Sequence, residues 1–178
     1  MLVEGSLPLA DKQATPQEVR ATMTTKFVWT EQLNIGIDVI DQQHRKIVDY
    51  INQLDDARLN GLPREEIVMV IIQLKEYTHS HFSFEESMLE EAGYPTLDAH
   101  KKSHALFIQR ISDYQFRFIK GEDVSKALSS LLVTWLYNHI QRDDADYVEA
   151  VQKHLRQQST FVEDFVNKKK GFFASLFD

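Results

Sequence analysis

The chain has 178 residues, enough for one domain with extensions, and its 43% hydrophobic and 26% charged residues are typical of a folded globular protein. Its 20 basic and 27 acidic residues give a net charge of -7, which argues against nucleic acid as a partner. It contains no cysteine, so disulfides, thiolate metal sites and thiol catalysis are excluded, and any metal must bind histidine or carboxylate.

Residues 1–25 are mixed and polar, and a capping-box order starting at Thr15 predicts a short helix through about Met23. The chain does not open with a basic stretch followed by an apolar run, and no segment reaches the length of a membrane span. We therefore expect a cytoplasmic protein. Residues 26–38 carry isolated aromatic residues without a helical period, which indicates an ordered arm anchored by Trp29.

Four long helical segments follow, each bounded by residues that break helices. Apolar residues recur at spacings of three and four from about Val39 to Leu59, from Pro63 to a stop at Gly93, from about Leu97 to Lys120 and from Asp123 to about Gln157. Short connections between long helices make sequential neighbours antiparallel. We expect an all-α, up-down-up-down antiparallel four-helix bundle over residues 26–157, with an N-terminal extension (1–25) and a C-terminal amphipathic extension (158–178).

Several titratable side chains occupy positions that the helical period assigns to the core. They come from all four helices, and they are His44, His81, Glu85, His100, His104, His139 and Asp144 or a residue near it. Burial of each such group costs several kcal/mol unless it is compensated, and a bound metal is the obvious compensation. Imidazole nitrogen with carboxylate oxygen is the ligand set of non-haem iron, although zinc or manganese remains open on chemistry alone.

The spacing of these residues sharpens the prediction. A four-residue step on a helix returns to within about 40° of the starting direction, so His81 and Glu85 share a face, as do the two histidines of the third helix. His139 and Asp144 are five residues apart, which corresponds to a divergence of roughly 140°. Both can reach one centre only through a π-type bulge, which we predict. Seven candidate ligands exceed the needs of one tetrahedral zinc and favour a two-metal site with bridging carboxylates.

These residues resemble the hemerythrin family, in particular its bacterial members, over about residues 26–155. The matching motifs are Trp29, IDQQH (40–44), YTHSHFSFEE (77–86), YPTLDAHKKSH (94–104) and WLYNHIQRDDADY (135–147). The resemblance implies two iron ions with an oxo or hydroxo bridge. It assigns His100, His104 and His139 to one iron and His44 and His81 to the other, and it makes Glu85 and Asp144 bridging ligands. It further implies a dioxygen pocket lined by Ile47, Phe82, Trp135, Leu136 and Ile140, and Tyr147 as a donor to the Asp144 carboxylate.

The function implied by this resemblance is reversible dioxygen binding, for carriage, storage or delivery, by a binding protein and not an enzyme. Two alternatives use the same ligands: an oxygen or redox sensor that signals through its tail, and an enzyme that removes peroxide or nitric oxide. Residues 161–178 combine three lysines with aromatic residues at helical spacing. Such a segment is suited to docking on a protein partner or a membrane surface. The alternative is that it folds back onto the bundle and buries its aromatic rings. His79 lies two residues from His81, so we assign it to the surface.

Overall fold

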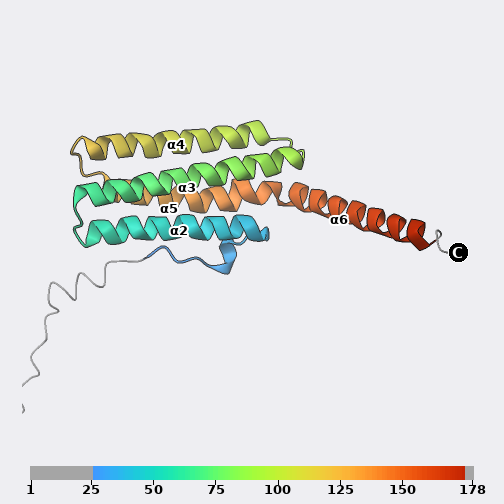
Figure 1. Ribbon diagram of the computed structural model, residues 1–178. Helices are drawn as coiled ribbons and strands as arrows, with labels where there is room; N and C mark the ends of the chain where they lie inside the picture. The colour runs from blue at the N-terminus through green and yellow to red at the C-terminus, as the bar shows by residue number, and fades with distance from the viewer. Residues whose placement is uncertain (1–25, 175–178) are drawn as a thin grey trace, which may run out of the picture.

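The computed structural model describes the backbone of residues 26–174 and the side chains of residues 26–160, so the short helix predicted through Met23 lies outside the described residues. Four antiparallel helices form a bundle: α2 (Asp38–Leu59), α3 (Arg64–Glu91), α4 (Leu97–Ile119) and α5 (Ser125–Asn138) (Figure 1). α2 packs against α3 and α5, and α4 packs against the same two helices. The described residues contain no strand, and the expected all-α four-helix bundle is confirmed.

Three of the helices end in the same tight closure. After α2 the chain turns at Gly61, whose φ of +65° is a left-handed conformation that glycine adopts without strain. The Leu62 N–H then donates to the Ala57 carbonyl at 3.0 Å, as in a Schellman motif. The same closure follows α3 and α4, from Tyr94 to Leu89 and from Glu122 to Arg117. These closures keep the connections short and make sequential helices antiparallel.

The buried apolar side chains form two clusters with the titratable residues between them. The larger cluster includes Ile47, and the smaller cluster includes Ile40. On α2, His44 lies between these two isoleucines in the sequence. On the last helix, His139 lies between Leu136 and Ile140 of the larger cluster, and Tyr147 of the smaller cluster follows further along the chain. The polar centre is therefore closed by apolar packing along the bundle in both directions.

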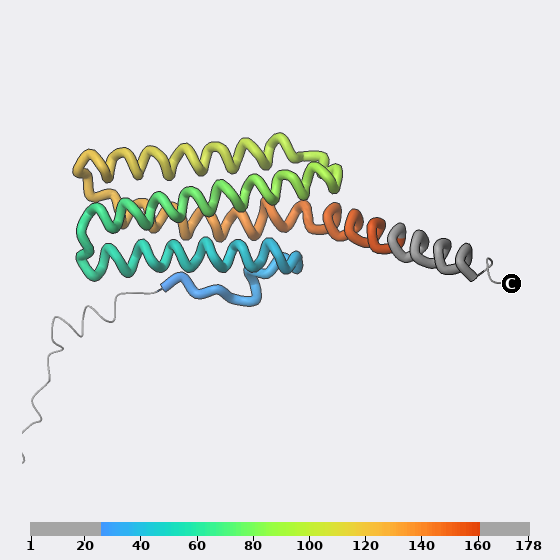
Figure 2. The backbone as a smooth tube through the Cα atoms, in the orientation of Figure 1, coloured from blue at the N-terminus to red at the C-terminus, as the bar shows by residue number. Residues whose placement is uncertain are grey.

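The arm that precedes the bundle runs beside α2 (Figure 2). Trp29, the predicted anchor, is half-buried and packs against the larger cluster. A short 3-10 helix, η1 (Glu31–Leu33), adds a second anchor, because its last residue is only 2% exposed. The buried Asp41 carboxylate accepts hydrogen bonds from the backbone N–H groups of Ile35 and Gly36 at 2.9 and 3.1 Å. The arm is thus held by apolar burial and by one carboxylate of α2.

The fourth helix of the bundle does not end where its apolar stripe fades. α5 continues without a break through a π-helical segment (His139–Asp144) into α6 (Ala145–Ala174), which extends past the bundle (Figure 1). The apolar stripe predicts an end of this helix at about Gln157. Its continuation has a simple cause, because neither glycine nor proline occurs between that residue and Gly171. None of the helices in the described part of the chain combines the length and apolar character that a membrane span requires.

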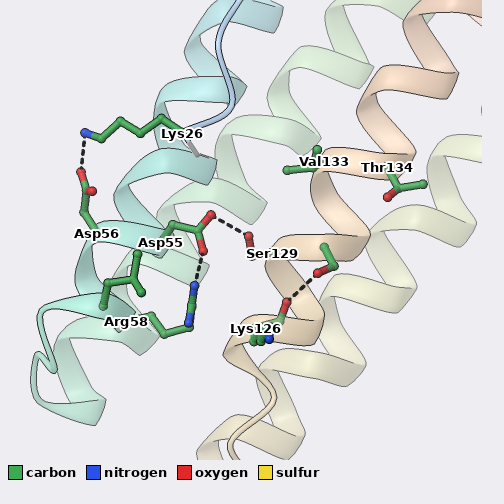
Figure 3. Close-up of a pocket in the computed structure, with 10 residues that line it drawn as sticks. Lys26, Asp55, Asp56, Arg58, Lys126, Ser129, Val133 and Thr134 are labelled. Atoms are coloured by element: carbon green, nitrogen blue, oxygen red, sulfur yellow. Dashed lines mark hydrogen bonds and ion pairs between the residues drawn. The ribbon is translucent and has the colours of Figure 1, made fainter. Parts of the chain in front are cut away.

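A charged groove lies between α2 and α5, at the opposite end of α2 from the titratable cluster (Figure 3). Four of its charged side chains form two pairs: Lys26 Nζ lies 3.0 Å from Asp56, and the Arg58 guanidinium lies 3.1 Å from Asp55. The Ser129 hydroxyl donates to the same Asp55 carboxylate at 2.8 Å. These contacts join the arm, α2 and α5, which gives the groove a structural role.

Candidate metal centre

The seven titratable side chains assigned to the core converge between the helices. α2 contributes one histidine, α3 a histidine and a glutamate, α4 two histidines, and the π-helical segment the remaining pair. All are between 0 and 5% exposed: His44, His81, Glu85, His100, His104, His139 and Asp144. His79 is exposed, as its position two residues from a buried histidine predicts.

The π-helical segment brings His139 and Asp144 to the same point. The Nε2 atom of His139 lies 3.0 Å from Oδ1 of Asp144, although five residues separate them. In a regular α-helix the two side chains would diverge by roughly 140°. The extra residue in the turn removes this divergence, and the predicted π-type bulge is confirmed.

Each of the two carboxylates faces histidines of both predicted groups. Oδ2 of Asp144 lies 3.3 Å from Nε2 of His44, while Oδ1 faces the histidine of the π-helical segment. In Glu85, Oε2 lies 3.4 Å from Nε2 of His81 and 3.7 Å from Nε2 of His104, and Oε1 lies 3.1 Å from Nε2 of His100. Both carboxylates therefore lie between the two groups of histidines, which is where bridging ligands would have to lie.

Several polar atoms of this cluster are buried without a hydrogen bond. Among the described residues they include both ring nitrogens of His44, Nε2 of His81, Oε2 of Glu85 and both carboxylate oxygens of Asp144. An unsatisfied buried polar atom costs about 1–3 kcal/mol. The nitrogens and oxygens approach within 4 Å without the geometry of hydrogen bonds, so their lone pairs point into shared space. Metal cations would supply the missing partner, and this donor set fits them.

The outward-facing nitrogens of three histidines are held by oxygen atoms from outside the cluster. His81, His104 and His139 are hydrogen-bonded at Nδ1 by Gln43, Glu86 and Asp143, at 2.7, 2.9 and 2.8 Å respectively. Because amide and carboxylate oxygens are acceptors, Nδ1 of each ring carries a hydrogen, and Nε2 faces the centre. Sequence reasoning missed these three residues. The only available signal was that each directly precedes or follows a predicted ligand.

The histidines differ in protonation. Burial lowers the pKa of His44 to about 4 and that of His81 to about 3, and it also lowers the pKa of His104. Burial opposes protonation of His139 as well, but attraction to the Asp144 carboxylate and the hydrogen bond to Asp143 outweigh it and raise the pKa of His139 to about 10. These three histidines are therefore neutral near pH 7, as metal ligands must be. His139 is positively charged at this pH, because it carries a second proton that it must lose before it can bind a metal.

Two of the predicted pocket residues stack on histidines of the centre. The Phe82 ring lies 3.6 Å from the His104 ring at an interplanar angle of 3°, and Trp135 lies 4.2 Å from His139 at 18°. The other three are buried in the larger apolar cluster: Ile47, Leu136 and Ile140. All five residues thus lie on the larger-cluster side of the centre, where they would exclude water. Their role in a dioxygen pocket stays a prediction.

Tyr147 lies on the other side, within the smaller cluster, and is completely buried. Its ring centroid is 5.6 Å from that of His100. Burial, together with the charges of Glu85 and Asp144, strongly raises the pKa of the Tyr147 hydroxyl. The hydroxyl therefore stays protonated, but it makes no hydrogen bond to the described residues, and the predicted donation to Asp144 stays a prediction.

The fold and the cluster define a helical-bundle protein with a buried histidine and carboxylate centre. The model of the hemerythrin HHE cation binding domain matches residues 35–151. Bacteriohemerythrins from Pseudomonas aeruginosa (strain UCBPP-PA14) and Stenotrophomonas maltophilia (strain R551-3) are 52% and 49% identical to this chain over 131 residues, 74% of this chain and 85% of each relative. A solved wild-type hemerythrin is 30% identical, with a TM-score of 0.66, covering 70% of this chain and 96% of its own. The chain belongs to the hemerythrin family.

Metal binding should be coupled to proton release, because His139 must lose its proton to bind a cation. We expect Zn²⁺ binding to the metal-free protein to release a proton near pH 7, and its affinity to rise with pH up to about 10. Calorimetric titration in buffers of different ionisation enthalpy measures the release. The exposed His79→Ala variant should release as many protons as the wild type. Binding without proton release would contradict the assignment of His139.

Proposed function

We propose that this protein binds dioxygen reversibly at a non-haem di-iron centre, for carriage, storage or delivery. One observation carries the proposal: seven buried side chains converge, and each of the two carboxylates lies beside histidines of both groups. Membership of the hemerythrin family, shown by the match over residues 35–151, supports it. In this proposal the chain is a binding protein and not an enzyme.

The residues divide into two iron positions. His100, His104 and His139 form the three-histidine position, His44 and His81 form the two-histidine position, and Glu85 and Asp144 bridge them. A bound iron pair would supply the two electrons that reversible binding of dioxygen requires. The two carboxylates offset half of the charge of two divalent cations, and the neutral histidines add none, so the centre tolerates burial.

Aromatic and aliphatic side chains around the centre exclude water from it. Phe82 and Trp135 cover two of the histidines with aromatic rings, and buried aliphatic side chains surround them. A water-poor surrounding supports reversibility, because water and anions compete for the same position and leave the oxidised form stranded. Tyr147, protonated and buried beside the carboxylates, is the candidate donor on the opposite side.

Iron content tests the ligand assignment. The wild type should contain two irons per chain, and His81→Ala and Glu85→Ala should each lose iron, because both leave buried ligands without a partner. His79→Ala is the matched control, since its imidazole lies two residues from His81 and is exposed. Elemental analysis of the purified proteins measures the difference. Unchanged iron in both substituted proteins would reject the assignment.

The optical spectrum tests reversibility. The reduced protein, prepared without air, should gain a visible absorption band on exposure to dioxygen and lose it when dioxygen is removed. The same sample should repeat this cycle. A band that decays within seconds to a spectrum that degassing does not reverse would contradict a carrier and support the enzyme that removes peroxide or nitric oxide.

Trp135 tests the role of the aromatic cover. Trp135→Ala should keep its iron, because the ring stacks on His139 without being a ligand, but it should oxidise faster in air as water enters. Tyr137→Ala, an exposed aromatic position on the same helix, is the control. The rate is followed from the decay of the visible band. Equal decay in Trp135→Ala and wild type would remove the ring from the proposed pocket.

A sensor is the second candidate, and one feature favours it. Asp144, a proposed bridging ligand, directly precedes α6, so the helix that carries the centre is continuous with the segment that leaves the bundle. A change at the centre therefore has a direct route along the chain. Deletion of residues 161–178 should leave dioxygen affinity intact and abolish a partner interaction if the protein is a sensor. Unchanged interactions would favour the carrier.

A further inference from the structure

We propose that Glu86 and Asp143 lower the reduction potential of the three-histidine position relative to the two-histidine position, because each carboxylate holds a histidine of the first position and neither holds one of the second. This inference rests on the proposed di-iron centre and concerns how the protein makes its two irons unequal. The two carboxylates are positioning residues, since they act on the metal through an imidazole.

The contacts on the three-histidine side are short and charged. Glu86 Oε1 accepts from Nδ1 of His104 at 2.9 Å, and Asp143 Oδ2 accepts from Nδ1 of His139 at 2.8 Å. The Nε2 atoms of the same two histidines lie 2.9 Å from each other. The Nε2 atoms of the two rings therefore face the same point in the centre, and each ring has a carboxylate at its Nδ1 atom on the opposite edge.

The two-histidine side lacks such an anion. Nδ1 of His81 meets the neutral amide oxygen of Gln43 at 2.7 Å. Nδ1 of His44 is buried and forms no hydrogen bond with any of the described residues. Two carboxylates are thus hydrogen-bonded to Nδ1 atoms of the three-histidine position. No carboxylate of the described residues is hydrogen-bonded to Nδ1 of either histidine of the other position.

Both outer carboxylates reach solvent, which favours their charged form. The Glu86 side chain is 25% exposed in a groove of about 460 Å³ that Lys101 also lines. The Asp143 side chain is 42% exposed.

An anionic acceptor at Nδ1 changes the imidazole as a ligand. It draws the Nδ1 hydrogen, raises the basicity of Nε2 and adds negative charge near the metal. Each effect stabilises the more highly charged, oxidised metal and lowers its reduction potential. The three-histidine position should therefore lose the first electron when the reduced protein is oxidised stepwise by an external one-electron oxidant.

Reduction potentials of the iron-loaded protein test this directly, by spectroelectrochemical titration without dioxygen. Glu86→Gln and Asp143→Asn each remove one charge at nearly constant size. We expect each to raise the lower midpoint, by about 59 mV for a tenfold weaker stabilisation of the oxidised form. Glu90→Gln is the matched control. It removes the same charge one turn along α3, where the glutamate pairs with Lys101 at 3.6 Å and contacts no histidine of the centre.

The reciprocal variant is Gln43→Glu, which adds an anion behind His81. It should lower the upper midpoint and narrow the gap between the two potentials. The inference is overturned if Glu86→Gln and Asp143→Asn shift the lower midpoint no more than Glu90→Gln does, or if Gln43→Glu moves the lower midpoint instead of the upper.

Iron analysis of the same samples separates this inference from the proposed function. A wild type without two irons would reject the proposed function itself. A wild type with two irons whose potentials ignore these substitutions would reject the tuning alone. If Glu86→Gln lost iron, Asp143→Asn and Gln43→Glu would still decide the matter, because they act on different histidines.

Discussion

Convergence of five imidazoles and two carboxylates in a space closed to water is the constraint around which the structure is arranged. Two apolar clusters close the bundle on either side of these groups, and oxygen acceptors on the outer edges of three rings fix their orientation. The π-helical segment turns Asp144 inward. Each device has the same effect, which is to gather nitrogen and oxygen donor atoms around common points where metal cations could bind.

Much of this was accessible from the sequence, because it depends on periodicity. Burial of an apolar stripe at a spacing of three and four predicted the four helices, and the same period placed His81 and Glu85 on one buried face. The five-residue spacing of His139 and Asp144 was informative because a regular helix cannot accommodate it, and a π-helical turn occurs there. Where helix geometry alone decides which way a side chain points, the sequence was sufficient to predict that it is buried.

The remainder depends on contacts between elements distant in the chain. Glu86 and Asp143 look like ordinary surface acids, and only the packing of α3 against α4, and the turn of the π-helical segment, bring them to histidine nitrogens. Asp41 likewise lies on the buried face of its helix. Its role, which is to accept hydrogen bonds from the backbone N–H groups of Ile35 and Gly36, becomes visible only when the arm is in place. The end of the last helix was misplaced because the apolar stripe fades at about Gln157, whereas a helix ends only where its backbone is interrupted or loses support.

The centre therefore combines inner groups that sequence periodicity predicts with outer groups that only the fold assembles, and the outer groups make its two halves unequal. We propose that two irons occupy the space that these side chains enclose. Anomalous scattering from a crystal of the protein, measured at the iron edge, tests it most directly. We expect two peaks, one against His44 and His81 and the other among His100, His104 and His139. A single peak, or peaks away from these side chains, would contradict it.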